Sequence, residues 1–488
     1  MLFNSIEFII FFIVVLAAIT IFHQKKIQHF FLLFGSYFFF YFSSNYLITL
    51  LVISTVLDYY IGNAIHKTSN KKQKKLLLFS SLAGNLGLLG FFKYADFTID
   101  QINEIFYNAN LEPIPHLDLI LPIGISFYTF QTISYTVDIY REKLEPSKSF
   151  KEFALFVSFF PQLVAGPIVR ASQFLPQLRE KISNSNGKRL RLITIEKSNL
   201  KFGITLISIG FFKKMFFADN IAPLVNEIFA NPIGLDSFEI WLGTIAFGIQ
   251  IYGDFSGYSD IAIGAAFILG FKIPKNFNFP YFATSPSDFW RRWHISLSSW
   301  LRDYFYIPLG GNKKSEKRTY LNLVAVMFVG GLWHGASWNF AIWGLLHGLY
   351  LMVHRFISKK VPWFSNNNFF KTRLGKIISI SIMQYFVFLA WIPFRVHDTN
   401  HMIYAMEKFI LLEIEFTNII PYLLVHKWPV AFIFGFIILH FITYKKPNFV
   451  EKISNLSLKW WTIFLTVIIT SIIFTFNGDP QDFIYFRF

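Results

Sequence analysis

Two histidine-containing stretches, forty residues apart, hold the side chains best suited to acid–base chemistry. The first, SPSDFWRRWHISLSSWLRDY at 285–304, contains His294, and the second, GGLWHGASW at 330–338, contains His334. Both are set in strongly apolar sequence, where an ionisable side chain near the bilayer centre costs about 2.5–3.5 kcal/mol. A chain tolerates that cost mainly where the group faces a polar cavity or a partner, so both histidines are candidates for a functional site.

His334 is the sharper of the two candidates. A neutral imidazole, with an ordinary pKa of about 6.5, can take a proton from a hydroxyl group and return it near neutral pH. Gly330, Gly331 and Gly335 flank it and permit a helix break and the close approach of a substrate to the backbone. The alternative is a hydrogen-bonded structural histidine between helices. His347, thirteen residues later, is expected to be structural and to face the other way on a continuous helix.

The stretch around His294 predicts one helix from Pro286 to about Tyr306, begun by a capping box at 285–288. Helical periodicity places an aromatic stripe beside a polar stripe, the first made of Trp290, Trp293, Leu297, Trp300 and Tyr304 and the second of Arg291, His294, Ser298 and Arg302. The arginines suit a phosphate-bearing donor that approaches from the cytoplasm. An interfacial helix would also explain the arginines and tryptophans, but it gives His294 no role.

Other chemistries lack their residues. The chain has no cysteine, which excludes disulfides, thiolate metal sites and an acyl-cysteine intermediate. It also lacks a Gly-x-Ser-x-Gly elbow, a P-loop and a dinucleotide fingerprint in its strand context. No histidine and carboxylate residues have metal-ligand spacing, so we expect neither a metal nor a permanently bound cofactor.

The elements that must position these residues are membrane helices. Hydrophobic residues make up 54% of the 488 residues and come in blocks of the length of a membrane span. The pattern predicts an all-α polytopic membrane protein with about 11–12 transmembrane helices plus re-entrant and amphipathic helices. We expect one integral membrane domain over 1–488, a broken pair of short helices at 150–169, and separate short helices at 241–255 and 259–271.

The net charge of +16 does not indicate nucleic-acid binding. Most basic residues lie in short loops between spans, as the positive-inside rule requires of a membrane protein. With the N-terminus outside, the loops around Lys72 and Lys359 are cytoplasmic, and the acidic stretch around Glu407 lies on the outer face. The partner indicated by the charge is therefore the membrane.

Six sequence blocks, in order, resemble the membrane-bound O-acyltransferase family, and most closely its branch of bacterial alginate O-acetylation proteins. The likeness covers about 30–400, leaving additional C-terminal spans at 401–488, and WIPFR at 391–395 also fits that branch. The blocks are LPIGISFYTFQ (121–131), SFFPQLVAGPIVR (158–170), DFSGYSD (254–260), FWRRWH (289–294), PLGGN (308–312) and LWHGASW (332–338).

The resemblance implies helices around a central funnel that acetyl-CoA enters from the cytoplasm. His334 matches the family's catalytic histidine, and His294 matches a second polar position that is asparagine in relatives acylating lipids and sterols. We expect these two residues to be catalytic and the donor to be bound by Arg291, Arg292, Arg302, Trp293 and Ser298. The likeness implies that acetyl crosses the inner membrane to O-acetylate a cell-surface, alginate-like exopolysaccharide, with a periplasmic SGNH-type acetyltransferase as partner.

Two alternatives stay open. A transporter or flippase of an acyl carrier or glycan would also carry intramembrane arginine and histidine, although the chain shows no repeated halves. A teichoic-acid D-alanylation-type acyltransferase would take its acyl group from a carrier-protein thioester. The sequence does not decide which polysaccharide is modified, whether the acyl group is longer than acetyl, or whether transfer is direct or proceeds through an acyl-histidine.

Overall fold

The chain is helical throughout the part that the structure describes. The computed structural model describes residues 1, 3–163, 166–183, 192–362, 367–446, 448–476, 478 and 483–484, and these are 78% helical with no strand among them. Six helical stretches of these residues are long and apolar enough to cross a membrane: Lys25–Lys67, Lys71–Asn108, Trp338–Lys360, Arg373–Arg395, Lys427–Lys445 and Leu458–Thr475. The all-α polytopic class is confirmed, while the count of 11–12 spans and the central funnel stay predictions.

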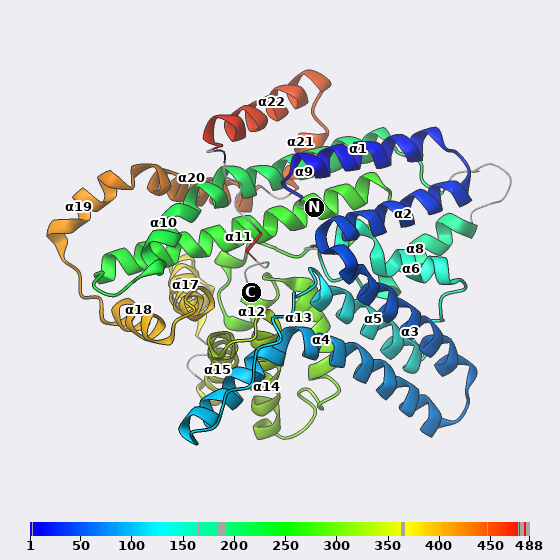
Figure 1. Ribbon diagram of the computed structural model, residues 1–488. Helices are drawn as coiled ribbons and strands as arrows, with labels where there is room; N and C mark the ends of the chain where they lie inside the picture. The colour runs from blue at the N-terminus through cyan, green and yellow to red at the C-terminus, as the bar shows by residue number, and fades with distance from the viewer. Residues whose placement is uncertain are drawn as a thin grey trace. The chain divides into compact units, whose positions relative to one another are not determined.

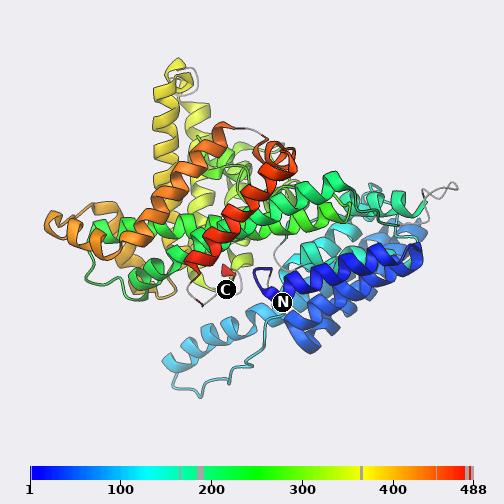
Figure 2. The same ribbon diagram turned by 90° about the horizontal axis from the view of Figure 1, so that it is seen from above.

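The described residues form two compact units, of which the first comprises Met1–Ile207 and Ser259–Pro274. Figure 1 shows α1 to α5 of this unit in blue to cyan, and α3, α4 and α5 pack together. Figure 2 shows the same ribbon seen from above. Its elements are α1 (Ile6–Ile21), α2 (Lys25–Ser44), η1 (Asn45–Leu47), α3 (Ile48–Lys67), α4 (Lys71–Asn108), α5 (Ile125–Tyr140), α6 (Phe150–Ser158), α7 (Phe160–Leu163), α8 (Ala171–Ser183) and most of α9 (Lys197–Phe211).

Hydrogen bonds between buried side chains hold α3, α4 and α5 together. Asp58 on α3 accepts from the Ser81 hydroxyl at 2.6 Å and from the Asn85 amide at 2.7 Å, and Thr132 on α5 donates to Asn85 at 3.1 Å. Lipid supplies little hydrophobic force between membrane helices, so such bonds and close packing associate them. The predicted pair of short helices at 150–169 is confirmed as α6 and α7; its residues 164–165 lie outside the described residues.

The second unit comprises Ser208–Tyr258 and Lys275–Phe488 and contains both candidate histidines. Its elements are the end of α9, the π-helix η2 (Phe212–Ala218), α10 (Asp219–Ala230), most of α11 (Ser237–Ile268), η3 (Pro280–Phe282), α12 (Pro286–Trp290), α13 (Ile295–Leu301), the π-helix η4 (Arg302–Tyr306), α14 (Glu316–His334), α15 (Trp338–Lys360), η5 (Asn368–Lys371), α17 (Arg373–Arg395), α18 (Thr399–Leu411), α19 (Phe416–Val425), α20 (Lys427–Lys445), α21 (Phe449–Ser454) and α22 (Leu458–Thr475).

The prediction of two separate helices at 241–255 and 259–271 is wrong, because α11 runs unbroken through the DFSGYSD block. The small residues of that block serve packing rather than a turn. A Cβ added to Gly257 would lie 2.7 Å from the carbonyl oxygen of Gly210. The helix therefore continues while its glycine lets the preceding helical segment approach closely.

Helices α14 and α15 carry the second histidine block and lie against each other along their length (Figure 1). A Cβ added to Gly331 would collide with the carbonyl oxygen of Phe340 and lie 3.0 Å from the Cα of Gly344. The glycines of this block thus bring the two helix backbones together, which fixes the end of α14 where His334 stands.

Candidate active site

The first histidine block is not one helix, which corrects the prediction of a helix from Pro286 to about Tyr306. Its start is confirmed: the Ser285 hydroxyl accepts from the backbone N–H of Asp288 at 3.2 Å. However, α12 ends at Trp290 and α13 begins at Ile295, with His294 between them at φ +41° and ψ +54°. This left-handed conformation is uncommon for a non-glycine residue and breaks the helical periodicity.

Asn276 compensates for that break. Its backbone carbonyl accepts from the N–H of Ile295 at 2.9 Å, and its side-chain oxygen accepts from the N–H and hydroxyl of Ser296 at 3.3 and 2.9 Å. These bonds satisfy donors that a continuous helix would have satisfied internally. Sequence reasoning missed Asn276, because it lies in a loop eighteen residues before His294 and no local pattern connects the two.

Because of the left-handed turn, His294 points into the interior and does not continue the predicted polar stripe. The side chain is fully buried, and its ring centroid lies 4.7 Å from that of Phe255, 6.0 Å from that of Trp333 and 6.4 Å from that of His334. Burial lowers the pKa of His294 to about 3, because this apolar setting disfavours the imidazolium. His294 is therefore a neutral hydrogen-bonding group at physiological pH.

His334 is the last residue of α14 and is 3% exposed. Gly335 is extended and α15 begins at Trp338, so the predicted helix break is confirmed. Three aromatic rings surround the imidazole, those of Trp333 at 5.1 Å, Trp343 at 5.0 Å and Phe394 at 5.3 Å. At Gly331 the close approach is that of helix α15, through Phe340 and Gly344. The approach of a substrate to the backbone near His334 stays a prediction.

His347 does not face away from this cluster, so the expectation that it points the other way is wrong. Because α14 and α15 are separate helices, the imidazole of His347 lies 4.9 Å from the same Trp343 ring that contacts His334. It is fully buried and stacks on Phe289 at 5.7 Å. The three histidines are thus joined by aromatic contacts within one unit.

Two buried imidazoles with their ring centroids 6.4 Å apart can act on one reacting group. One can accept a proton from a hydroxyl nucleophile, and the other can donate a hydrogen bond to a carbonyl oxygen that becomes negative. Among the described residues, no three histidine, aspartate or glutamate side chains are placed to hold a metal ion. The arrangement suits acid–base catalysis of a group transfer.

The three arginines of the first block lie outside this buried pair. Arg291 is exposed, Arg292 forms an ion pair with Asp288 at 2.9 Å, and Arg302 forms two bonds with the neighbouring Asp303 at 2.7 and 3.1 Å. Two of the guanidinium groups are therefore already engaged with carboxylates. Their part in binding a donor stays a prediction.

Trp293 and Ser298 are internal to the fold of the block. The Trp293 ring is 1% exposed and lies 4.9 Å from that of Trp391, so it packs in the aromatic core. The Ser298 hydroxyl donates to the carbonyl oxygens of Trp293 and His294 at 3.2 and 3.1 Å. Ser298 is thereby tied to the His294 turn, and donor binding by either residue stays a prediction.

A buried ionic cluster, which the sequence analysis did not predict, is connected to His294 through Phe255. Lys214 in η2 contacts Asp219 at 2.8 Å and Asp254 of the DFSGYSD block at 2.9 Å. Asp254 also accepts from the backbone N–H of Ile484 at 2.7 Å, and its neighbour Phe255 contacts His294. The available signal was a lysine inside an apolar segment together with an aspartate in a small-residue block.

The sequence profile described as MBOAT, membrane-bound O-acyltransferase family, matches residues 39–392, which include both histidines and the whole aromatic cluster around His334 except Phe394. This chain belongs to the membrane-bound O-acyltransferase family. The resemblance read from the six blocks is therefore confirmed, and the chain is a multi-pass membrane protein of that family.

Three curated relatives show which proteins the chain is similar to. The chain is 39% identical to a peptidoglycan O-acetyltransferase of Helicobacter pylori over 72% of this chain and 68% of the relative. It is 44% identical to "Probable alginate O-acetylase AlgI" of Pseudomonas aeruginosa over 62% of this chain and 56% of that relative, so it spans little more than half of that protein. A teichoic acid D-alanyltransferase of Bacillus subtilis is 28% identical over 59% of this chain and 71% of its own length.

Proposed function

We propose that this chain is an inner-membrane O-acetyltransferase that uses cytoplasmic acetyl-CoA to supply acetyl groups for O-acetylation of a cell-surface polysaccharide. The observation that carries the proposal is the pair of buried imidazoles, His294 and His334, brought within 6.4 Å from separate elements. The family and its O-acetylating relatives support the reaction class. A periplasmic SGNH-type acetyltransferase and an exopolysaccharide are the proposed partner and acceptor.

In the proposed step His334 takes the proton of the acceptor hydroxyl. The acceptor oxygen attacks the thioester carbonyl carbon of acetyl-CoA, the C–S bond breaks, and the CoA thiolate leaves with the proton that His334 returns. His294, neutral in its apolar setting, donates a hydrogen bond to the carbonyl oxygen as negative charge develops there. General-base catalysis of this kind contributes about 10²–10⁴-fold to the rate.

The experiment uses the purified full chain in lipid nanodiscs with labelled acetyl-CoA and alginate oligosaccharides or peptidoglycan fragments. Because the chain has no cysteine, a thiol reagent detects released CoA without a signal from the protein. The proposal expects CoA release together with a labelled glycan. Binding or movement of substrate without CoA release would overturn the acyltransferase proposal and favour the transporter alternative.

The likeness to the Bacillus subtilis teichoic acid D-alanyltransferase favours a second candidate, a D-alanylation-type acyltransferase. In this candidate, we propose, the donor is a carrier-protein thioester. The two candidates differ in the donor and not in the role of His334. Equal amounts of acetyl-CoA and of an acylated carrier protein, offered separately, distinguish them by which thioester is consumed.

A further inference from the structure

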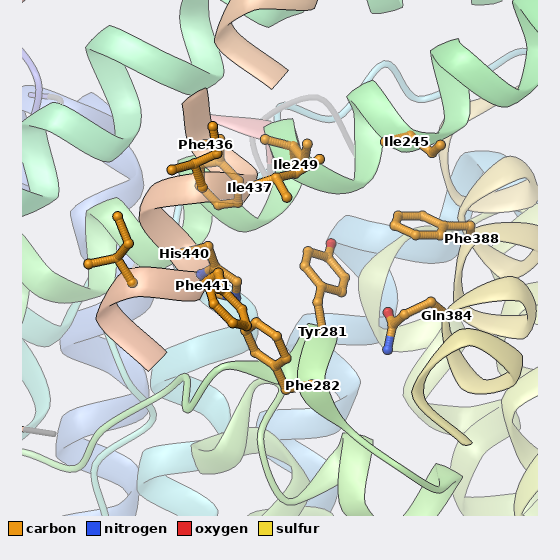
Figure 3. Close-up of a pocket in the computed structure, with 12 residues that line it drawn as sticks. Ile245, Ile249, Tyr281, Phe282, Gln384, Phe388, Phe436, Ile437, His440 and Phe441 are labelled. Atoms are coloured by element: carbon orange, nitrogen blue, oxygen red, sulfur yellow. The ribbon is translucent and has the colours of Figure 1, made fainter. Parts of the chain in front are cut away.

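The second unit contains a chamber that is separate from the histidine pair. The chamber opens at the exposed side of helix α20, a candidate membrane span. Its volume is about 520 Å³, within the range of small-molecule sites, and it lies between α11, η3, α17 and α20. Figure 3 shows Phe388 and Gln384 of α17 on one side, His440 and Phe441 of α20 on the other, and Tyr281 between them.

Two polar groups face this otherwise apolar chamber. The side-chain oxygen and nitrogen of Gln384 and the Nε2 of His440 are buried and have no hydrogen-bond partner among the described residues. The Tyr281 hydroxyl is satisfied, because it donates to the carbonyl oxygen of Gly248. Buried polar groups in membrane proteins are generally partnered or functional, so Gln384 and His440 indicate a ligand that brings a hydrogen-bonding group.

The lining excludes two simple occupants. A buried water molecule needs two to four polar partners, whereas most of the lining here is isoleucine and phenylalanine. A CoA molecule carries phosphates, and no lysine or arginine is among the described residues that line the chamber. The chemistry of the lining therefore fits a hydrocarbon chain that carries one uncharged hydrogen-bond acceptor.

The open side of the chamber indicates the source of the hydrocarbon chain that it would hold. Ile437, Ile438 and Phe441 line it and are 47%, 57% and 51% exposed on α20. This helix is one of the candidate membrane spans, so its exposed apolar side chains face bilayer hydrocarbon. An occupant can enter sideways from the membrane without passing the histidine pair.

We propose that the chamber binds one acyl chain of a membrane phospholipid, with the ester carbonyl accepting hydrogen bonds from the Gln384 amide and the His440 imidazole N–H. The bound acyl chain packs against Tyr281, which lines the chamber. The Tyr281 ring lies 6.4 Å from that of Trp293 in the aromatic core beside His294. This lipid site is distinct from the acyl-transfer site and does not depend on the proposed function.

The test uses the full chain in nanodiscs of phosphatidylethanolamine and phosphatidylglycerol that contain a phospholipid with a diazirine in one acyl chain. After illumination, mass spectrometry locates the cross-linked residues. The proposal expects cross-links concentrated on the chamber lining, and at least a fivefold lower yield there in Ile437→Trp and in Gln384→Leu. Leu439→Trp, an exposed residue of the same helix outside the lining, should stay within twofold of the wild type.

Two results would overturn the proposal. Cross-links spread evenly over the exposed faces of α20 and α22, unchanged by Ile437→Trp, would show ordinary annular lipid. Loss of the chamber cross-links on addition of acetyl-CoA would show that the donor, and not a lipid, occupies the chamber. Because cross-linking is read without turnover, an inactive acyltransferase would leave this test unaffected.

Discussion

His294 and His334 are both imidazoles, yet their settings give them different tasks. His294 sits in a strained turn with full burial, which keeps the ring neutral and fixes its direction. His334 sits at the end of a helix, where three aromatic rings and the following extended glycine define its position. A rigid neutral donor beside a base is the arrangement expected for attack of a hydroxyl on a thioester.

Replacing His294 by asparagine should reduce the loss of folding stability that occurs as the pH falls. The folded pKa of His294 is lowered to about 3, below its ordinary value of 6.5, so the unfolded chain binds an additional proton between these values. Stability is therefore lost as pH falls through that window, and His294→Asn removes this contribution. Thermal unfolding in detergent at pH 7.5 and 5 should show a smaller downward shift for the variant; an identical shift would contradict the assignment.

Removing Lys214 should destabilise the second unit strongly. The variant Lys214→Ala leaves the buried carboxylates of Asp219 and Asp254 without their cation, a loss of about 3–5 kcal/mol for broken buried pairs. Thermal unfolding and the yield of monodisperse protein measure the effect. Lys213→Ala is the matched control because Lys213 is only half-buried and its ammonium group lies over the Tyr252 ring. Equal losses in both variants would refute the role of the ion pair.

Among the elements, the histidine turn and the α14–α15 pair do most to build the site. The capping box, the end of α14 and the separation of α6 from α7 followed from local sequence, because caps, glycine and proline act over a few residues. The left-handed turn at His294 and the unbroken α11 could not be predicted from local sequence, because both depend on partners distant in the chain. Asn276 satisfies the first, and the packing of Gly257 against Gly210 accounts for the second.

The turn should fail when the Asn276 side chain is removed. Asn276→Ala leaves the N–H and hydroxyl of Ser296 without their acceptor, which costs about 1–3 kcal/mol and loosens His294. We expect at least a tenfold lower acyl-transfer rate with a detectably lower unfolding temperature. Asn278→Ala is the control, since Asn278 is exposed and its backbone N–H bond to Arg292 remains. An unaltered rate in Asn276→Ala would exclude this positioning role.

For the whole molecule, apolar blocks and charge alternation predicted a multi-pass helical protein, and the structure confirms that class. The choice of His294 and His334 as candidate site residues was possible from the sequence, because an ionisable group in apolar sequence is conspicuous. Their mutual distance was not, since it depends on how α13 and α14 pack. The single integral domain over 1–488 and the donor-binding residues stay predictions.

The orientation across the membrane can be tested without background, because the native chain has no cysteine. Single variants Lys72→Cys, Lys359→Cys and Glu407→Cys each place one thiol at an exposed position. With the N-terminus outside, a membrane-impermeant maleimide applied to intact spheroplasts should label Glu407→Cys alone, and the other two only after lysis. Labelling of Lys72→Cys in intact cells would reverse the orientation.

The measurement that tests the central claim most directly is the rate of acceptor-dependent CoA release by His334→Ala in nanodiscs. We expect a loss of about 10²–10⁴-fold in a protein that stays folded, because the general base is removed. His66→Ala, an exposed histidine in the other unit, should keep the wild-type rate. A folded His334→Ala protein that releases CoA at the wild-type rate would contradict the account.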